Sequence, residues 1–293
     1  MSKIKVSVVI PTHNRPDLIS RAIESVLNQT WQDFEIIVVD DGLEKRAETI
    51  IKSLSDSRIV YIKHDKERGG AAARNTGIKN AKGDYIAFLD DDDEWIPEKL
   101  KIQMDLFKDV PENVGFCFSA VINDTPSGRV NTFVYDGIKD FHEDALRRFN
   151  GFLTVTLIFK KIVFEQVGYF DEKFPSHQEL DLMIRVTKKF KGLGINKPLV
   201  LVDMTGSHEQ IGSKLARRID GRRMILDKYE NEYKKIPKVL AKHYFWLAIM
   251  CRDDKNFKEA RYYLYKALSI NKKIIYLLHF IRLYLPKYRK NNV

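Results

Sequence analysis

Five acidic residues follow a short apolar run in the text YIAFLDDDDEW, residues 85–95. The apolar run predicts a buried strand, so the carboxylates gather where that strand ends. Adjacent carboxylates repel one another, and burying them without a partner costs free energy. Carboxylates at alternate positions, with no His or Cys beside them in the sequence, suit Mn²⁺ or Mg²⁺. We therefore expect Asp90 and Asp92 to bind a divalent cation, the alternative being a solvated acidic loop.

Two other polar segments also follow apolar runs. PTHNR comes after residues 6–10, and the run at 34–39 leads into DDG. A carboxylate at such a strand end commonly binds a nucleoside, although Asp-Asp-Gly is also ordinary turn chemistry. We expect Asp40 to serve the turn and Asp41 to face a ligand.

The segment RGGAAARNTG, residues 68–77, begins a predicted helix with paired glycines. It lacks the glycine spacing of a dinucleotide site and the Gly-Lys-Ser/Thr of a P-loop, which excludes both of those sites. The guanidinium of Arg74 can clamp a phosphate or brace a nearby aspartate, and both roles are compatible with the sequence.

The elements that must position these residues alternate between strand and helix. Short apolar runs predict strands at 6–10, 34–39, 59–62 and 85–89, with helices at 16–27 and 97–107. This pattern indicates an α/β fold with a mostly parallel sheet covered on both faces, in which ligands bind at the carboxyl ends of the strands. Further strands are expected at 114–122, 154–159 and 198–204, a turn at 125–129, a helix at about 179–190, and helices alone after Gly206.

Composition and charge divide the chain into two parts. With 293 residues and 44% apolar content the chain can bury a full core, and its two cysteines fit a reducing cytoplasm. From Lys214 onward there are 21 Lys and Arg against 7 Asp and Glu, a net charge of +14, which leaves 29 against 33, or −4, for residues 1–213. A basic helical tail predicts an anionic partner or surface. We expect that partner to be a membrane surface, with no nucleic acid bound.

Two segments together resemble the nucleotide-sugar-binding half of glycosyltransferase family 2. They are VSVVIPTHNRPDLISRAIESVLNQTWQDFEIIVVDDG and RGGAAARNTGIKNAKGDYIAFLDDDDEW. The resemblance is dense over residues 5–108, thinner to about residue 210 and absent beyond. It implies the inverting A-type fold, a Rossmann-like nucleotide-diphospho-sugar transferase fold, with a C-terminal all-helical extension. The expected domains are a catalytic domain, 1–213, with a nucleotide-sugar-binding half, 1–108, and an acceptor-binding half, 109–213, followed by a basic helical extension, 214–293.

The family also implies roles for particular residues. A DxD element formed by Asp90 and Asp92 would bind Mn²⁺ or Mg²⁺ together with the donor's diphosphate, so the positive charge that the acidic turn lacks would arrive with the donor. His208, after the last core strand, would complete the metal shell. The remaining residues expected to bind the nucleotide sugar are Pro11, Thr12, His13, Asn14, Asp41, Arg74 and Asp91.

The catalytic base is expected in SHQELDLMIR, residues 176–185, where family members usually have Glu-Asp at the start of a helix. Glu179 matches the base by position. Ser176 and Glu179 also fit a capping box, which would give Glu179 a purely structural role. Asp181 is the second candidate, but it lies four residues before Arg185, the spacing of a helical ion pair. Glu179 and Asp181 are two residues apart, which places them on roughly opposite faces of a helix. Only one of the two carboxylates can therefore face the cleft, and we choose Glu179.

The resemblance implies an inverting, metal-dependent hexosyl- or N-acetylhexosaminyltransferase. The donor would be a nucleoside-diphosphate sugar, with a UDP-sugar favoured, and the acceptor a growing surface glycan or lipid-linked glycan. Two alternatives are a non-catalytic nucleotide-sugar-binding scaffold and a sugar-phosphate nucleotidyltransferase. The second normally has a glycine-rich loop after the first strand, and PTHNRPD contains no glycine.

The C-terminal segment KKIIYLLHFIRLYLPKYRKNN, residues 272–292, mixes an apolar helical stretch with flanking Lys and Arg. This composition is typical of a helix lying on an anionic membrane surface. The alternative is a helix that packs on a preceding helical hairpin, whose spacing resembles one tetratricopeptide repeat. The expected location is cytoplasmic, with peripheral attachment to the inner face of the cell membrane.

Overall fold

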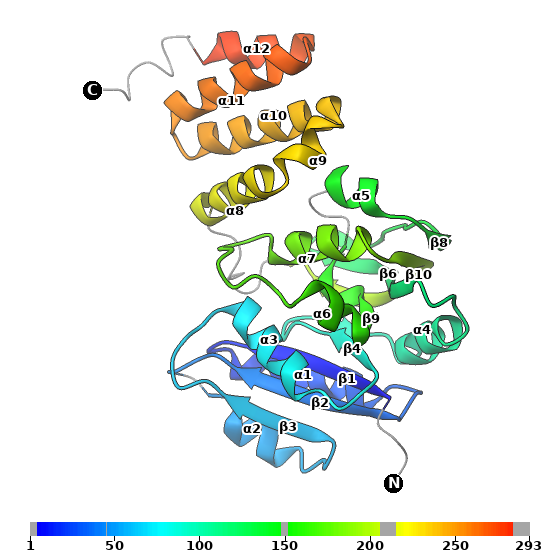
Figure 1. Ribbon diagram of the computed structural model, residues 1–293. Helices are drawn as coiled ribbons and strands as arrows, with labels where there is room; N and C mark the ends of the chain where they lie inside the picture. The colour runs from blue at the N-terminus through cyan, green and yellow to red at the C-terminus, as the bar shows by residue number, and fades with distance from the viewer. Residues whose placement is uncertain (1–4, 45, 148–151, 206–214, 284–293) are drawn as a thin grey trace. The chain divides into compact units, whose positions relative to one another are not determined.

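The computed structural model describes residues 5–44, 46–147, 152–205 and 215–283 (Figure 1). The chain forms two compact units. One, the body, comprises Met1–Glu172 and Glu179–His208, and the other, the extension, comprises Lys173–Gln178 and Glu209–Val293. The expected boundary at residue 213 lies close to the second division, whereas the transfer of Lys173–Gln178 to the extension has no counterpart in the sequence pattern.

A single sheet organises the body. Its main path, among the described residues, runs β3-β2-β1-β4-β9-β6-β10-β5, with β7 beside β6 and β8 beside β10. The strands β1, β2, β3 and β4 are mutually parallel, and β6 and β10 are parallel to each other. The strand bounds are β1 Val6–Thr12, β2 Phe34–Asp40, β3 Ile59–Lys63, β4 Tyr85–Phe88, β5 Glu94–Trp95, β6 Val114–Thr125, β7 Gly128–Asn131, β8 Gly137–Lys139, β9 Ile158–Lys160 and β10 Lys191–Asp203.

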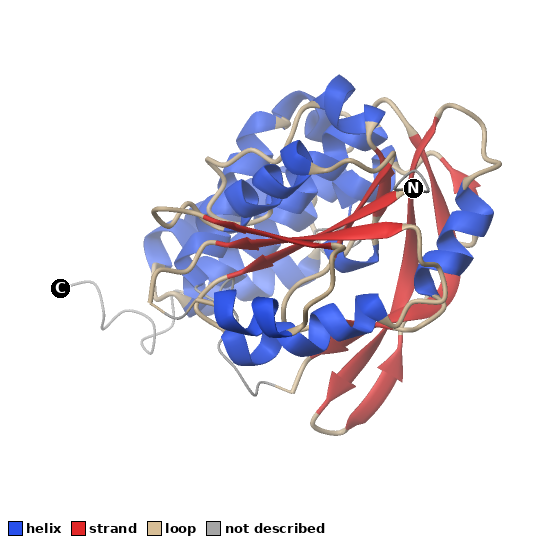
Figure 2. Cartoon of the chain, turned by 90° about the horizontal axis from the view of Figure 1, so that it is seen from below, coloured by secondary structure: helices blue, strands red, loops and turns tan. Residues whose placement is uncertain are grey.

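Helices cover both faces of this sheet (Figure 2). On one face, alternate strand residues such as Val8 and Ala87 join a core with apolar side chains of α1 (Pro16–Leu27), α2 (Glu48–Ser53) and α4 (Lys99–Phe107). On the other face α3 (Gly70–Asn80) comes so close that a Cβ on Gly77 would lie 2.2 Å from Val9. The ring of Phe88 contacts Phe164 of α6 (Ile162–Val167) on that face. The predicted doubly covered α/β sheet is therefore confirmed.

Most predicted elements of the body form, and several differ in extent from the prediction. Helix α1 has the predicted bounds, and α7, Gln178–Thr187, ends three residues before the predicted end of that helix. Strand β10 begins at Lys191 and not at Pro198. The predicted strand at 154–159 is wrong in its first half, where Thr154–Thr156 form a 3₁₀ turn. There the hydroxyl of Thr156 donates to the carbonyl of Leu153 over 2.8 Å, a local bond that competes with strand pairing.

The described part of the extension beyond residue 214 is helical, as predicted. Its helices are α8 Leu215–Lys228, α9 Glu230–Lys234, α10 Pro237–Asp253, α11 Phe257–Ile270 and α12 Ile274–Arg282, whereas α5 His142–Arg147 belongs to the body. Helices α10 and α11 pack together, and each buries apolar residues at helical spacing, namely Leu247, Ala248, Ala260, Leu264 and Ala267. Within the described ranges, every helix is too short or too polar to cross a membrane.

Candidate active site

The polar segments behind β1, β2 and β4 meet at one edge of the sheet, as the parallel order requires. Thr12, the last residue of β1, pairs in register with Asp40, the last residue of β2. The hydroxyl of Thr12 also donates to Asp91 Oδ2 over 2.7 Å. This bond joins residues 79 positions apart in the sequence. The predicted convergence on the carboxyl ends of the strands is confirmed.

Three carboxylates of the acidic turn cluster closely enough to share one cation. The ligand atoms of Asp90, Asp92 and Asp93 all lie within 4.8 Å of one another. Burial, together with the charges of Asp90 and Asp92, raises the pKa of Asp93 to about 8. A cluster of oxygen ligands whose own repulsion favours protonation fits a hard divalent cation, which would relieve that repulsion. Asp90 and Asp92 are the ligands expected from the sequence, whereas Asp93 was not expected, although it continues the same acidic run.

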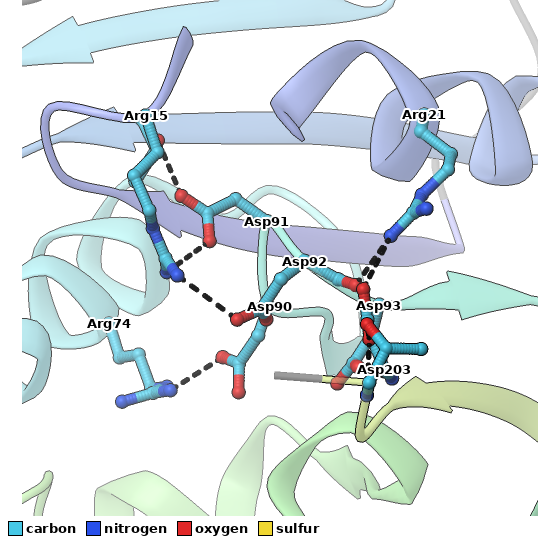
Figure 3. Close-up of polar contacts among 10 residues, drawn as sticks. Arg15, Arg21, Arg74, Asp90, Asp91, Asp92, Asp93 and Asp203 are labelled. Atoms are coloured by element: carbon cyan, nitrogen blue, oxygen red, sulfur yellow. Dashed lines mark hydrogen bonds and ion pairs between the residues drawn. The ribbon is translucent and has the colours of Figure 1, made fainter. Parts of the chain in front are cut away.

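Arginine side chains already compensate part of this negative charge (Figure 3). Arg15 Nη2 donates to Asp91 Oδ1 over 2.5 Å, and its Nη1 donates to Asp92 Oδ2 over 3.0 Å. Arg74 Nη2 donates to Asp90 Oδ1 over 2.6 Å. The turn is therefore held between two cations that lie within hydrogen-bonding distance of carboxylates and can also bind phosphate. Arg15 was missed in the sequence, even though it ends the polar text PTHNR.

Asp91 differs from its neighbours because it points into the protein. Its side chain is 1% exposed and contacts Thr12 and Arg15. Burial raises the pKa of Asp91 to about 6, against the opposing effects of Arg15 and the Thr12 hydroxyl. The contacts of Asp91 fix the acidic turn to the end of β1, and the predicted contact of Asp91 with the donor stays a prediction.

The loop after β1 is shaped by one residue with a left-handed backbone. Asn14 has φ 55°, and its Oδ1 accepts a bond from the backbone N–H of Glu44 over 3.0 Å. A Cβ on Gly42 would lie 2.5 Å from Asn14 N, so glycine is required at that close approach. His13 Nε2 lies 2.9 Å from Glu67 Oε1. Pro11 lies in β1, opposite Val39 of β2, and His13 and Asn14 belong to a defined loop that follows the strand.

Asp40, the last residue of β2, and Asp41, which follows it, are both buried and both hydrogen-bonded. Asp40 accepts bonds from the backbone N–H of Gly42 and Ala47 and from the Tyr61 hydroxyl, which is the structural role predicted for it. Asp41 is 3% exposed. Its carboxylate accepts from the backbone N–H groups of Arg68 and Gly69 and lies 2.7 Å from His64 Nδ1. Asp41 therefore fixes the loop before α3, and its predicted contact with a nucleoside stays a prediction.

Glu179 and Asp181 occupy different surroundings, as their spacing predicts. Asp181 is fully buried, and its Oδ2 accepts two bonds from Arg185, the predicted ion pair. Glu179 is half-buried at the start of α7. Burial alone would lower the pKa of Arg74, but the negative charges of Asp90 and Glu179 outweigh burial and raise it. Arg74 is thus electrostatically coupled to both the acidic turn and Glu179, which supports Glu179 over Asp181 as the carboxylate facing the site.

Two features complete the surroundings of the acidic turn. A polar pocket of about 290 Å³ lies beside it, lined by residues that include Arg21, Asp92, Glu94 and Asp203. Asp203 ends β10, and its backbone N–H donates to Asp93 Oδ1 over 3.1 Å, which brings the last core strand to the turn. His208, the expected third metal ligand, lies outside the described residues.

The sequence and structure of this chain are similar to those of known proteins. A family model described as Glycosyl transferase family 2 matches residues 7–167. A Rickettsia felis protein named "Uncharacterized glycosyltransferase" is 37% identical over 214 residues, which are 69% of this chain and 33% of that protein. WfaP of Escherichia coli, a UDP-Glc:alpha-D-GlcNAc-diphosphoundecaprenol beta-1,3-glucosyltransferase, is 42% identical over 114 residues, 39% of this chain and 45% of that protein. The chain thus spans less than half the length of these curated relatives.

A solved structure shows the same fold. The crystal structure of S. aureus TarS 1-349 in complex with UDP-GlcNAc has a TM-score of 0.67 to this chain at 17% sequence identity. The match covers 95% of this chain and 79% of that one. The agreement extends the likeness well past residue 167, where the family model stops, and at this identity it concerns the fold alone.

Proposed function

Because the chain belongs to glycosyl transferase family 2, we propose that it transfers a hexosyl or N-acetylhexosaminyl group from a nucleoside-diphosphate sugar to an acceptor hydroxyl, with inversion. A UDP-sugar is the favoured donor. One observation carries this proposal: three clustered carboxylates, Asp90, Asp92 and Asp93, stand with Arg15 and Arg74 at the carboxyl ends of parallel strands. Such an edge is where open α/β sheets bind nucleotides.

Asp90, Asp92 and Asp93 are the residues that would hold Mn²⁺ or Mg²⁺, and His208 stays a candidate fourth ligand. When bound, the cation would neutralise charge on the departing diphosphate. Arg74 would also help to neutralise the diphosphate, because it is placed to exchange its bond with Asp90 for bonds to phosphate oxygens. The end of β1, Pro11 and Thr12, and the residues that follow it, His13 and Asn14, would bind the nucleoside end of the donor together with Asp41 and Asp91.

Glu179 is the proposed general base. A carboxylate that accepts the proton of an attacking hydroxyl must be ionised and accessible, and Glu179 is half-buried beside the positive charge of Arg74. Asp181 is the weaker candidate, because Arg185 already binds its buried carboxylate. One displacement by the acceptor oxygen inverts the anomeric centre, and this reaction needs no nucleophile from the protein.

The acceptor is proposed to be a growing surface glycan, including one carried on a lipid. The E. coli relative WfaP, named as a glucosyltransferase that acts on a diphosphoundecaprenol-linked sugar, supports this class. The reaction would then take place on the cytoplasmic side of the membrane that carries the acceptor.

Helix α12 supports a peripheral membrane attachment of the extension. Ile274, Leu277, Leu278 and Ile281 have helical spacing on one face, and all four side chains are exposed, Ile274 by 75%. Exposed Lys272, Lys273 and Arg282 flank them. An outward apolar stripe between basic ends has the makeup of an interfacial helix on an anionic bilayer.

Replacing Asp92 by Asn tests the transfer reaction. A panel of nucleotide sugars with Mn²⁺ should yield free nucleoside diphosphate with the natural chain, and turnover should fall about a hundredfold or more in the variant. Release of pyrophosphate would instead identify a nucleotidyltransferase. Binding of UDP without turnover of any donor would identify a scaffold. Full turnover by the variant would overturn the metal role of the acidic turn.

A further inference from the structure

We infer that the extension positions the catalytic base, because it holds the six residues of backbone that lead directly into Glu179. The inference rests on the proposed role of Glu179. Lys173–Gln178 belongs to the same compact unit as α8–α12, and the chain returns to the body at Glu179. Helix α7 begins at Gln178, so its first residue lies in the extension and the base is its second.

Helix α8 binds this segment through specific contacts. The hydroxyl of Ser176 donates to the carbonyl of Arg217 over 3.0 Å. Lys228 Nζ lies 5.1 Å from the centre of the Phe174 ring, and that ring is 2% exposed. Both ends of α8 therefore contact the segment, one through a hydrogen bond and the other through a cation–π contact.

Gly221, midway along α8, lets the two backbones approach. A Cβ at this position would lie 2.3 Å from Ser176 Oγ and 2.6 Å from the carbonyl oxygen of Ser176. Glycine is unfavourable in a helix interior, so its presence at this contact indicates that close packing is required there. Because one of the two atoms belongs to the backbone, an added methyl group would have to displace the segment itself.

The backbone of the segment is strained at His177. It has φ 61°, a left-handed conformation that is strained for a side chain with a Cβ and persists where the surroundings impose it. Its Nδ1 lies 2.7 Å from Ser176 Oγ. Burial, together with the positive charges of Arg222 and Arg218, lowers the pKa of His177 to about 3, so the ring stays neutral. The strained turn stands two residues before Glu179, where a small rotation redirects the start of α7.

The backbone that precedes this segment, at Phe170 and Glu172, is held by contacts within the body. The side-chain amide of Asn75 donates to the carbonyl of Phe170 over 2.9 Å and to Glu172 Oε1 over 2.9 Å, and it accepts from the backbone N–H of Phe170. Asn75 follows Arg74, the arginine coupled to Glu179. The body thus holds the backbone at Glu172 through Asn75 of α3, and within the extension α8 holds Ser176, three residues before the base.

The test introduces Gly221→Ala into the full chain, with Ser176→Ala as a milder second variant. Asp227→Ala is the matched control, because Asp227 is an exposed residue of the same helix and the change likewise favours the helix. Four quantities are measured: kcat, the donor KM, the affinity for UDP with Mn²⁺, and hydrogen–deuterium exchange over residues 173–187. The expected result for Gly221→Ala is a kcat lower by about ten- to a hundredfold, the loss that follows from misplacing a catalytic group by an ångström or less.

A purely structural defect would lower the folded fraction, so the number of UDP molecules bound per chain would fall in step with kcat and exchange would accelerate throughout the chain. Misplacement of the base instead leaves the donor KM, the UDP affinity and the UDP stoichiometry unchanged, accelerates exchange only at the start of α7, and leaves Asp227→Ala like the natural chain. Ser176→Ala should show a smaller fall in kcat. If Glu179→Gln abolishes transfer while both segment variants keep the natural kcat, the inference is overturned and the proposed function stands. If no donor is turned over by the natural chain, the proposed function fails, and unchanged exchange in Gly221→Ala would also overturn the anchoring.

Discussion

The guanidinium of Arg74 lies 2.6 Å from the carboxylate of Asp90, measured from Nη2 to Oδ1. The negative charge of Glu179 acts on the same guanidinium. One cation therefore links a residue of the acidic turn to the proposed base, although α7 lies far from both α3 and the turn in the sequence. The bond also shows that bracing an aspartate, one of the two roles that the sequence allowed for Arg74, is real in this structure.

Replacement of Arg74 by Met should weaken donor binding by about 1.5–3 kcal/mol, the contribution of a hydrogen bond to a charged group. The donor KM should rise and kcat should fall, since the variant loses the cation placed between the diphosphate site and the base. Arg74→Lys is the control that retains the charge and loses the planar fork, so it should recover only part of the affinity. Isothermal titration with UDP and steady-state kinetics measure both effects. If Arg74→Met bound the donor as tightly as the natural chain does, a role of Arg74 in diphosphate binding would be contradicted.

Arg15 should contribute to folding before any ligand binds. Arg15→Met would leave the carboxylate of Asp91, 1% exposed, without its cation, and should lower the free energy of unfolding by about 3 kcal/mol. Adding Asp91→Asn should recover much of that loss, because the buried charge is then also removed. Urea unfolding in the presence of EDTA measures the effect without metal.

Arg21→Met is the matched comparison for Arg15, since Arg21 also pairs with carboxylates at this edge but is 46% exposed. Exposed pairs contribute less than about 1 kcal/mol, so its loss should be small. Equal losses for Arg15→Met and Arg21→Met would contradict the assignment of a buried ion pair to Arg15.

Glu179→Gln and Asp181→Asn should separate catalysis from folding. Glu179→Gln should lower kcat by about a hundred- to ten-thousandfold, the usual contribution of a general base, with little change in stability. Asp181→Asn should instead lower the free energy of unfolding by about 3 kcal/mol, because it leaves Arg185 without its buried partner. The folded Asp181→Asn protein should keep most of its kcat. The reverse pattern would make Asp181 the base.

Buried Lys99 should make stability depend on pH. Its Nζ lies 4.0 Å from the centre of the Trp95 ring and donates to Gln103 Oε1, and burial lowers the pKa of Lys99 to about 7. Between about pH 7 and 10 the unfolded chain holds this proton and the folded chain does not, so stability rises with pH by at most about 1.4 kcal/mol per unit. This rise in stability is complete above the pKa of Lys99 in the unfolded chain and absent below its pKa in the folded chain.

The Lys99→Met variant isolates this effect. Its stability relative to the natural chain should decline steadily as the pH is raised from 7 to 10, measured by urea unfolding at each pH. Lys101→Met, on the exposed side of the same helix, should show no such trend. A constant difference between Lys99→Met and the natural chain would mean that Lys99 titrates at the same pH in the folded and unfolded states.

The sequence predicted the features of this protein that depend on local pattern. The bounds of α1, the parallel strands and the meeting of Thr12 with the acidic turn follow from apolar periodicity and strand order. Roles that depend on distant partners did not follow, because a pattern does not reveal which cation reaches which carboxylate. Arg15 and Asp93 are such cases, and Asp41 proved to be bonded to the loop before α3.

The sequence pattern also did not predict that Lys173–Gln178 belongs to the extension. Its determinants are the close approach allowed by Gly221 and the left-handed backbone of His177, and both are tertiary features. A glycine within a helical pattern signals only that some close contact is required, and it does not identify the partner.

Helix α12 should bind anionic membranes through its outward apolar stripe. The side chains of Leu277, Leu278 and Ile281 are 44–52% exposed, and burying them in the interface of a bilayer is favourable by about 25 cal/mol per Å² of apolar area. Each flanking Lys or Arg adds about 1 kcal/mol on an anionic surface. Vesicles of phosphatidylglycerol and phosphatidylcholine should therefore co-sediment with the full chain, less so as salt is raised, because salt screens the basic residues.

Leu277→Glu combined with Ile281→Glu should reduce this sedimentation at least about tenfold, since each change places a like charge against the anionic surface. Val130→Glu is the control, because Val130 is an equally exposed apolar residue, 55%, in strand β7 of the body. It should bind vesicles as the natural chain does. Equal loss in both variants would show a general effect of added negative charge. Binding to pure phosphatidylcholine as strong as to the anionic mixture would contradict the role assigned to Lys272, Lys273 and Arg282.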